Sequence, residues 1–171
     1  MIFRPSRKLA TKIKAGKLAS LPPAEDPLTD WSSHLFVAGR VQYILLSNTG
    51  SLYSAVMYGR GITGMSEYIK LALATLRETL EAHGLGEVYR RHIFPTTGPV
   101  RFAGASGRAV TGSINELVAQ AKFLLAGDDL SPFDLGSRLN DVLLSSIAVG
   151  GRDKYSTPQA AFKAMLEGFE S

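Results

Sequence analysis

The chain has 171 residues, a formal net charge of +4 at pH 7, and 45% hydrophobic and 20% charged residues. This balance is ordinary for a globular protein and excludes disorder of the whole chain, and the length suits a single domain over residues 1–171. The absence of cysteine excludes disulfide bonds, thiolate metal ligands and cysteine nucleophiles, and it fits a cytoplasmic location. No apolar run approaches the roughly 20 residues of a membrane-spanning helix, so we expect no membrane partner.

The chain begins with a predicted strand at residues 1–4 and a helix that Ser6 caps, with Leu9 and Ile13 facing the core. The first 17 residues carry six basic side chains and no acidic one. Three interpretations stay open: a solvated helix face, an arm that binds nucleic acid by releasing counterions from phosphates, and a transit peptide. The candidate nucleic-acid contacts are Arg7, Lys8, Lys12 and Lys14.

A proline-rich loop at residues 19–30 separates this start from three runs rich in β-forming residues. The runs lie at residues 31–37, 41–47 and 51–58. The links between them are short enough for hairpins, so the three runs are expected to form an antiparallel meander.

Apolar periodicity predicts a first main helix at residues 65–83, with Gly84 at its stop. Strands are then expected at residues 87–94 and 100–103. A second helix is placed from Gly107 onward, because its apolar stripe reaches back beyond the capping box that begins at Ser113.

Two further helices are predicted in the C-terminal part of the chain. Ser131 and Pro132 open the third helix, and a glycine-containing connection at residues 150–157 leads to the last one. The apolar side of the last helix is expected to dock on the core, with a partner-binding helix as the alternative. The predicted fold class is therefore α+β, a small antiparallel β-meander sheet packed by about four main helices. The third helix is expected to carry Leu135, Leu139, Val142, Leu143 and Ile147.

Residues 59–64 read G-x-G-x-x-G between an apolar run and a helix, which resembles a dinucleotide-binding turn. That turn requires a parallel βαβ unit, whereas the preceding run pairs through a hairpin, and no acidic residue closes the following strand. We therefore predict no dinucleotide cofactor. A looser anion site at this turn stays open, with Gly59, Arg60, Gly61 and Gly64 as candidate anion-binding residues.

The sequence contains no catalytic signature of useful specificity. His34, His83 and His92 have no metal-ligand spacing, and neither a nucleophile elbow nor a phosphate-binding P-loop motif occurs. We predict no catalytic residue, no metal site and no cofactor, which favours a protein that is not an enzyme.

A polar cluster is predicted beside the apolar stripe of the second helix. Its members are Arg108, Ser113, Asn115 and Glu116. Capping with a salt link explains them structurally, and a ligand-facing cluster is the functional alternative.

The segment R-A-V-T-G-S-I-N-E, residues 108–116, resembles the R-x-V-x-G-S-x-N-[DE] pattern of an uncharacterised domain family of bacteria and mobile elements. Other pieces agree in order: the basic strand-helix start, the W-x-x-x-L-F and N-x-x-x-L-Y pieces of the meander, Leu139-Asn140, and Pro158 with Ala161-Phe162. The resemblance implies no known activity. It implies that the basic start belongs to the fold, which disfavours the transit peptide.

Two functions follow from these observations. The first is a non-enzymatic binding or regulatory module of the cytoplasm, acting through a protein or nucleic-acid partner. The alternative is a nucleotide- or anion-binding domain, or an enzyme, that uses the 59–64 turn together with Arg108, Asn115 and Glu116.

Overall fold

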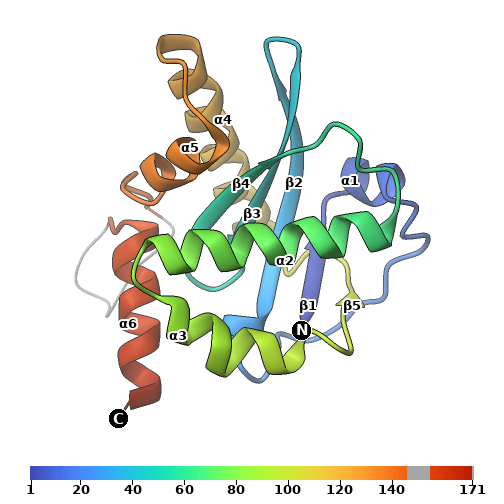
Figure 1. The fold of residues 1–171 in the computed structure, drawn as a ribbon, viewed down its shortest axis with the longest axis vertical. Coiled ribbons are helices and arrows are strands. Elements are labelled where there is room, and N and C mark those ends of the chain that lie inside the picture. The colour runs from blue at the N-terminus through green and yellow to red at the C-terminus, as the bar shows by residue number, and fades with distance from the viewer. Residues whose placement is uncertain (146–154, 171) are drawn as a thin grey trace.

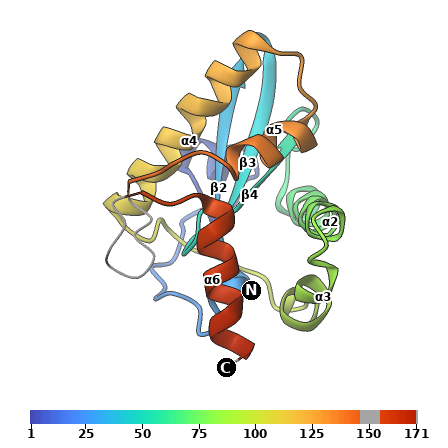
Figure 2. The same cartoon turned by 90° about the vertical axis from the view of Figure 1, so that its left-hand side faces the viewer.

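A computed structural model describes residues 1–145 and 155–170 and contains a five-stranded sheet with helices on both faces (Figures 1 and 2). Its centre is the predicted meander of β2 (Asp30–Ala38), β3 (Val41–Asn48) and β4 (Ser54–Tyr58), in which both pairings are antiparallel. The three β-rich runs of the sequence therefore form the strands that the hairpin links predict.

The sheet continues beyond the meander with two parallel strands, in the order β4-β3-β2-β1-β5. β1 (Ile2–Pro5) lies parallel to β2 on one side and to β5 (Arg101–Phe102) on the other. The sheet is therefore mixed, and the predicted purely antiparallel sheet is wrong in this part. A parallel neighbour needs a long crossover connection, so no hairpin in the sequence indicates it.

Five α-helices of more than one turn flank the sheet in the described part of the chain, as the α+β prediction requires (Figure 1). They are α1 (Arg7–Lys12), α2 (Met65–Ala82), α4 (Arg108–Gly127), α5 (Pro132–Leu139) and α6 (Pro158–Glu170). The predicted cap of α1, the stop of α2 and the start of α4 near Gly107 are confirmed. Two short 3-10 turns are η1 (Pro27–Thr29) and η3 (Phe94–Thr96).

The segment at residues 87–94 is helical, and the strand predicted there is wrong. It forms a single turn, α3 (Gly86–Val88), which continues into a π-helical turn, η2 (Tyr89–Ile93). Tyr89 and Ile93 lie four residues apart and are both buried, which is the spacing of one helical face. A short run of β-branched and aromatic residues does not distinguish such a face from a strand.

α5 is shorter than the sequence predicts. It ends at Leu139, Leu143 is 64% exposed, and Ile147 lies outside the described residues. The side chain of Asn140 is buried and bonds to the backbone of Ser54 at the start of β4. Its Oδ1 accepts the Ser54 N–H over 2.7 Å, and its Nδ2 donates to the Ser54 carbonyl over 3.0 Å. These two bonds fix the end of α5 on the edge strand.

We expect Asn140→Ala to lower the free energy of unfolding by about 2–3 kcal/mol, because it leaves two buried backbone groups of Ser54 without a partner. Urea unfolding followed by circular dichroism measures the change. Asn115→Ala, an exposed asparagine on α4, is the matched control and should stay within about 0.5 kcal/mol. Equal effects of the two substitutions would show that the Ser54 bonds do not hold α5.

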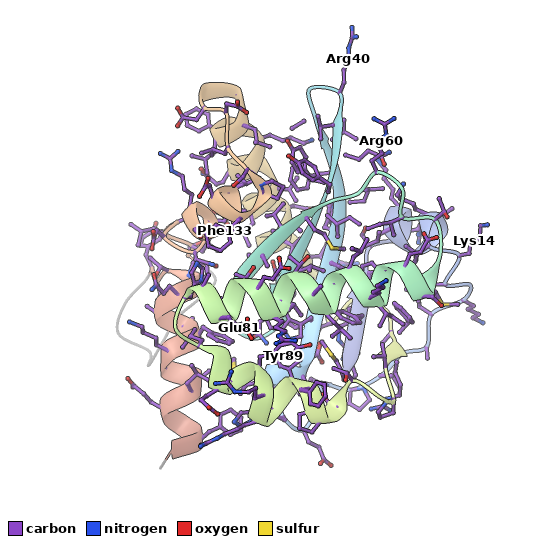
Figure 3. All side chains as sticks on the ribbon, in the orientation of Figure 1. Lys14, Arg40, Arg60, Glu81, Tyr89 and Phe133 are labelled. Atoms are coloured by element: carbon purple, nitrogen blue, oxygen red, sulfur yellow. The ribbon has the colours of Figure 1, made fainter. Side chains whose placement is uncertain are left out.

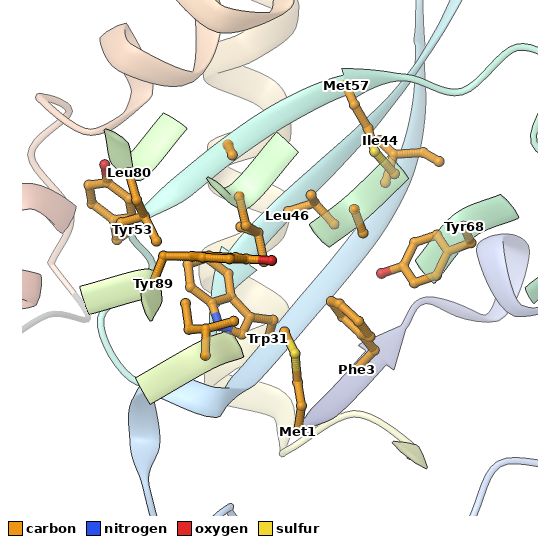
Figure 4. Close-up of a cluster of buried hydrophobic side chains, with 14 of the residues drawn as sticks. Met1, Phe3, Trp31, Ile44, Leu46, Tyr53, Met57, Tyr68, Leu80 and Tyr89 are labelled. Carbon is orange, nitrogen blue, oxygen red and sulfur yellow. The ribbon is translucent and has the colours of Figure 1, made fainter. Parts of the chain in front are cut away.

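The two faces of the sheet carry separate hydrophobic cores, because side chains alternate along each strand. Ile44 and Leu46 of β3 belong to the core under α2, which also holds Trp31 at its centre (Figure 4). Tyr43 and Leu45 of the same strand belong to the core under α4 and α5. We call these the α2-side core and the α4-side core.

Candidate functional site

A pocket of about 820 Å³ lies where the parallel strands β1 and β5 end. After β1 the chain enters α1, whose Leu9 and Ile13 join the α2-side core. After β5 it enters α4, whose Ile114 and Leu117 join the α4-side core. Adjacent parallel strands whose connections leave to opposite faces open a crevice at their carboxyl ends, and open α/β sheets bind ligands there. The topology therefore accounts for the position of the pocket.

The pocket is lined by cations and hydroxyl groups. Arg7, Lys14 and Lys17 are exposed and come from α1 and the segment that follows it. No described residue that lines the pocket is acidic. Such a lining has a positive potential and donates hydrogen bonds, which suits an anion. The hydroxyl-bearing residues of the lining are Ser6, Thr11, Ser32, Ser33, Ser106 and Thr111.

One wall of the pocket contains Arg4, which forms a buried ion pair with Asp30 behind it. The Arg4 guanidinium binds both carboxylate oxygens of Asp30, with Nε–Oδ1 at 2.8 Å and Nη2–Oδ2 at 2.9 Å. Its remaining donors reach the carbonyls of Leu21, Pro22 and Gly104 over 2.9–3.2 Å. Arg4 is thus fully engaged within the protein, and its role at the pocket is to join the 19–30 loop to the end of β5.

The carboxylate of this pair is held ionised by its surroundings. Burial alone would raise the pKa of Asp30, but hydrogen bonds from Arg4 and Thr49 outweigh burial and lower it. Asp30 therefore stays charged at neutral pH and continues to compensate the buried guanidinium.

His34 of β2 is half-buried in the pocket, on the face of the sheet that α4 covers. Burial lowers the pKa of His34 below its usual value, and the positive charges of Lys8 and Lys122 lower it further. The imidazole is therefore neutral near pH 7 and offers one donor and one acceptor to the pocket.

The structure places the four candidate nucleic-acid contacts in different positions, and only some of them lie at the pocket. Arg7 and Lys14 line the pocket. Lys8 is exposed on α1 and adds to the positive potential at His34. Lys12 points to the sheet, where its Nζ donates to Gln42 Oε1 over 3.0 Å. Two of these four side chains therefore line the pocket directly, Arg7 from α1 and Lys14 from the segment that follows it.

The turn at residues 59–64 lies apart from the pocket, between the edge strand β4 and α2. Gly61 has a φ of +85°, which glycine adopts without strain. Glu67 Oε2 accepts the Thr63 N–H over 2.8 Å, so the protein's own carboxylate occupies this helix start. Arg60 projects outward from the connection (Figure 3). Gly59 directly follows β4 and donates its N–H to the Gln42 carbonyl of β3. Gly64 is the N-cap of α2. This arrangement favours the interpretation that these residues form the turn itself rather than a ligand site.

The predicted polar cluster on α4 does not converge. Arg108, Asn115 and Glu116 are exposed, whereas Ser113 is buried and donates to the Ala109 carbonyl over 3.0 Å. Within residues 1–145 and 155–170, no ion pair joins Arg108 to Glu116. The 108–116 segment instead lines the pocket through the residues that lie between these polar ones, namely Val110, Thr111 and Ile114.

His83 joins a second polar group that the sequence does not reveal. Its Nδ1 bonds to the Tyr53 hydroxyl and its Nε2 lies 3.0 Å from Ser137 Oγ. Burial lowers the pKa of His83, so its ring is neutral near pH 7. His92 lies elsewhere and pairs with Asp26 at 2.9 Å. Among the described residues, no group of three or more histidine, aspartate or glutamate side chains is arranged to hold a metal ion.

Comparison with known proteins identifies one family. The model of a family described as a domain of unknown function, DUF6933, matches residues 2–161. No curated protein and no solved structure matches the chain. In the part of the chain that the structure describes, no helix is long and apolar enough to cross a membrane. Both segments that best express the family resemblance, the basic start and residues 108–116, meet at the pocket.

Proposed function

Because this chain belongs to the DUF6933 family, whose function is unknown, we propose a function from the pocket itself. The protein is a non-enzymatic binding module, and its ligand is an anion held between α1 and α4. The observation that carries this proposal is the convergence of Arg7, Lys14 and Lys17 on a pocket without acidic lining. The module works in the cytoplasm as one domain.

Compensation of the three cations by described carboxylates is limited to a longer-range attraction, such as that between Lys14 and Glu67. Within the described residues, no carboxylate forms an ion pair with Arg7, Lys14 or Lys17. Like charges gathered on one surface repel one another, and a bound anion removes that repulsion. Phosphate suits the site because lysine, arginine and hydroxyl groups are its ordinary ligands in proteins.

A nucleic-acid strand is the second candidate ligand, because Lys8 extends the basic surface along α1 beyond the pocket. Such a strand would bind with an affinity that falls steeply as salt rises, since each neutralised phosphate releases counterions. A single phosphate in the pocket would show a much smaller salt dependence.

We expect Lys14→Gln combined with Lys17→Gln to weaken the binding of inorganic phosphate by at least about tenfold, because each charge-assisted hydrogen bond is worth roughly 1.5–3 kcal/mol. Isothermal titration calorimetry measures the affinity, and a single-stranded DNA oligomer is titrated in parallel at two salt concentrations. Arg60→Gln is the matched control, because it removes one exposed cation at the 59–64 turn.

Unchanged phosphate binding in the lysine variant would overturn the proposal. Loss of binding in Arg60→Gln instead would move the anion site to the 59–64 turn. Tight and salt-dependent binding of the oligomer, with weak binding of phosphate, would favour the nucleic-acid ligand.

A further inference from the structure

Aliphatic side chains form part of the interior of the pocket, beside the buried Arg4 and the half-buried His34. Ala10 and Ile114 line it and are each only 7% exposed, so they lie deep. Leu18 and Val110 line it at intermediate depth. The three cations are exposed and therefore stand at the rim. A ligand that fills this space meets charge at its outer end and hydrocarbon within.

The deep hydroxyl groups of the pocket have hydrogen-bond partners within the protein. Ser33 Oγ accepts the Tyr68 hydroxyl over 2.7 Å, and Ser32 Oγ lies 2.8 Å from Thr49 Oγ1. These bonds hold the two side chains on protein partners but do not saturate them, because a hydroxyl group can both donate and accept. The aliphatic side chains are therefore the part of the interior that favours an apolar ligand body.

Most of the side chains that nucleotide sites use are missing from the described lining. It contains no phenylalanine, tyrosine or tryptophan, so the half-buried His34 imidazole is the one aromatic ring that the described lining offers a nucleobase for stacking. It also contains no carboxylate or side-chain amide. Carboxylates hold the magnesium ion of a bound triphosphate, and carboxylates and amides accept hydrogen bonds from sugar hydroxyls. The pocket thus suits a ligand that accepts hydrogen bonds at one end and is hydrocarbon at the other.

We propose that the ligand is a phosphate monoester with an aliphatic body. This inference rests on the anion-binding function proposed above. The phosphate lies at the rim with Arg7, Lys14 and Lys17, and the hydrocarbon chain enters between Ala10 and Ile114.

The test is a titration of the intact protein with ethyl, butyl and hexyl phosphate, and with adenosine monophosphate and hexanoate for comparison. Each methylene group that is added to the chain and buried is expected to strengthen binding about threefold to fourfold. Hexyl phosphate should therefore bind far more tightly than ethyl phosphate, adenosine monophosphate or hexanoate. Leu18→Ser should reduce the gain per methylene, whereas Leu71→Ser, which changes an exposed leucine on α2, should leave that gain unchanged.

The inference is overturned if affinity does not depend on chain length, or if adenosine monophosphate or hexanoate binds as tightly as hexyl phosphate. Inorganic phosphate separates this failure from that of the proposed function. If phosphate binds through Lys14 and Lys17 while the alkyl series is flat, the anion site stands and only the aliphatic body is wrong.

Discussion

Arg4→Met is expected to lower the free energy of unfolding by about 3–5 kcal/mol, because it leaves the Asp30 carboxylate buried without its partner. The Arg4 side chain is 1% exposed and that of Asp30 is 4% exposed, so water does not replace the guanidinium. The carbonyls of Leu21, Pro22 and Gly104 lose their donors in the same step. Urea unfolding at pH 7 measures the loss.

A second substitution and a change of pH show whether the loss of stability in Arg4→Met comes from the unpaired charge or from lost packing. Arg4→Met with Asp30→Asn removes both charges and should recover much of the loss, since an uncharged pair of similar volume is often tolerated. In Arg4→Met alone, burial raises the pKa of Asp30 above its unfolded-state value. The folded state then binds more protons, so this variant regains stability as pH falls through the raised pKa. A loss that is independent of pH and is not recovered by the second substitution would assign the effect to packing.

Sulfate is expected to bind more tightly as pH falls, by about tenfold or more over the full transition, because an adjacent anion raises a histidine pKa by roughly one to three units. In the free protein burial and then Lys8 and Lys122 lower the pKa of His34. A bound dianion raises the pKa of His34, so binding takes up a proton. Affinity is then greatest below the pKa of the free protein and falls as pH rises to the pKa of the complex.

Sulfate is the appropriate probe for this measurement, because its charge stays constant between about pH 5 and pH 8, whereas a phosphate monoester titrates near pH 6. Calorimetric titrations at several pH values give the profile. His34→Gln should bind sulfate with a flat profile over the same range. A profile that survives in His34→Gln would assign the proton to another group and remove His34 from the site.

The elements that the sequence predicts well are those with a local signal. The stop of α2 follows from Gly84, which has a φ of +75°, and the start of α5 follows from Ser131 and Pro132, whose capping bond the structure contains. The strand predicted at residues 87–94 is wrong, because the apolar spacing of this segment suits a helical turn as well as a strand. Local residue types determine where α2 ends and where α5 begins, whereas tertiary packing determines that residues 87–94 are helical.

The site was less predictable than the fold because it depends on a pairing between distant parts of the chain. Charge alone indicates Arg7 and Lys14, which lie in a conspicuous basic run. His34, Ser106 and Thr111 become neighbours of that run only because β1 pairs with both β2 and β5. No local pattern encodes a parallel pairing, so an isolated histidine and two hydroxyl residues carry no signal in the sequence.

The position of β1 between β2 and β5 indicates an order of assembly. β1 precedes both of its partners in the chain, and its two ladders form only when β2 and then the much later β5 are available. Contacts between residues distant in the chain form slowly, because closing the long loop between them costs entropy before the contacts contribute any stability. The strands of the meander are close in the chain, so they can pair before β5 joins β1. The pocket is consequently among the last features to form, and a chain that binds the proposed anion must already have completed its sheet.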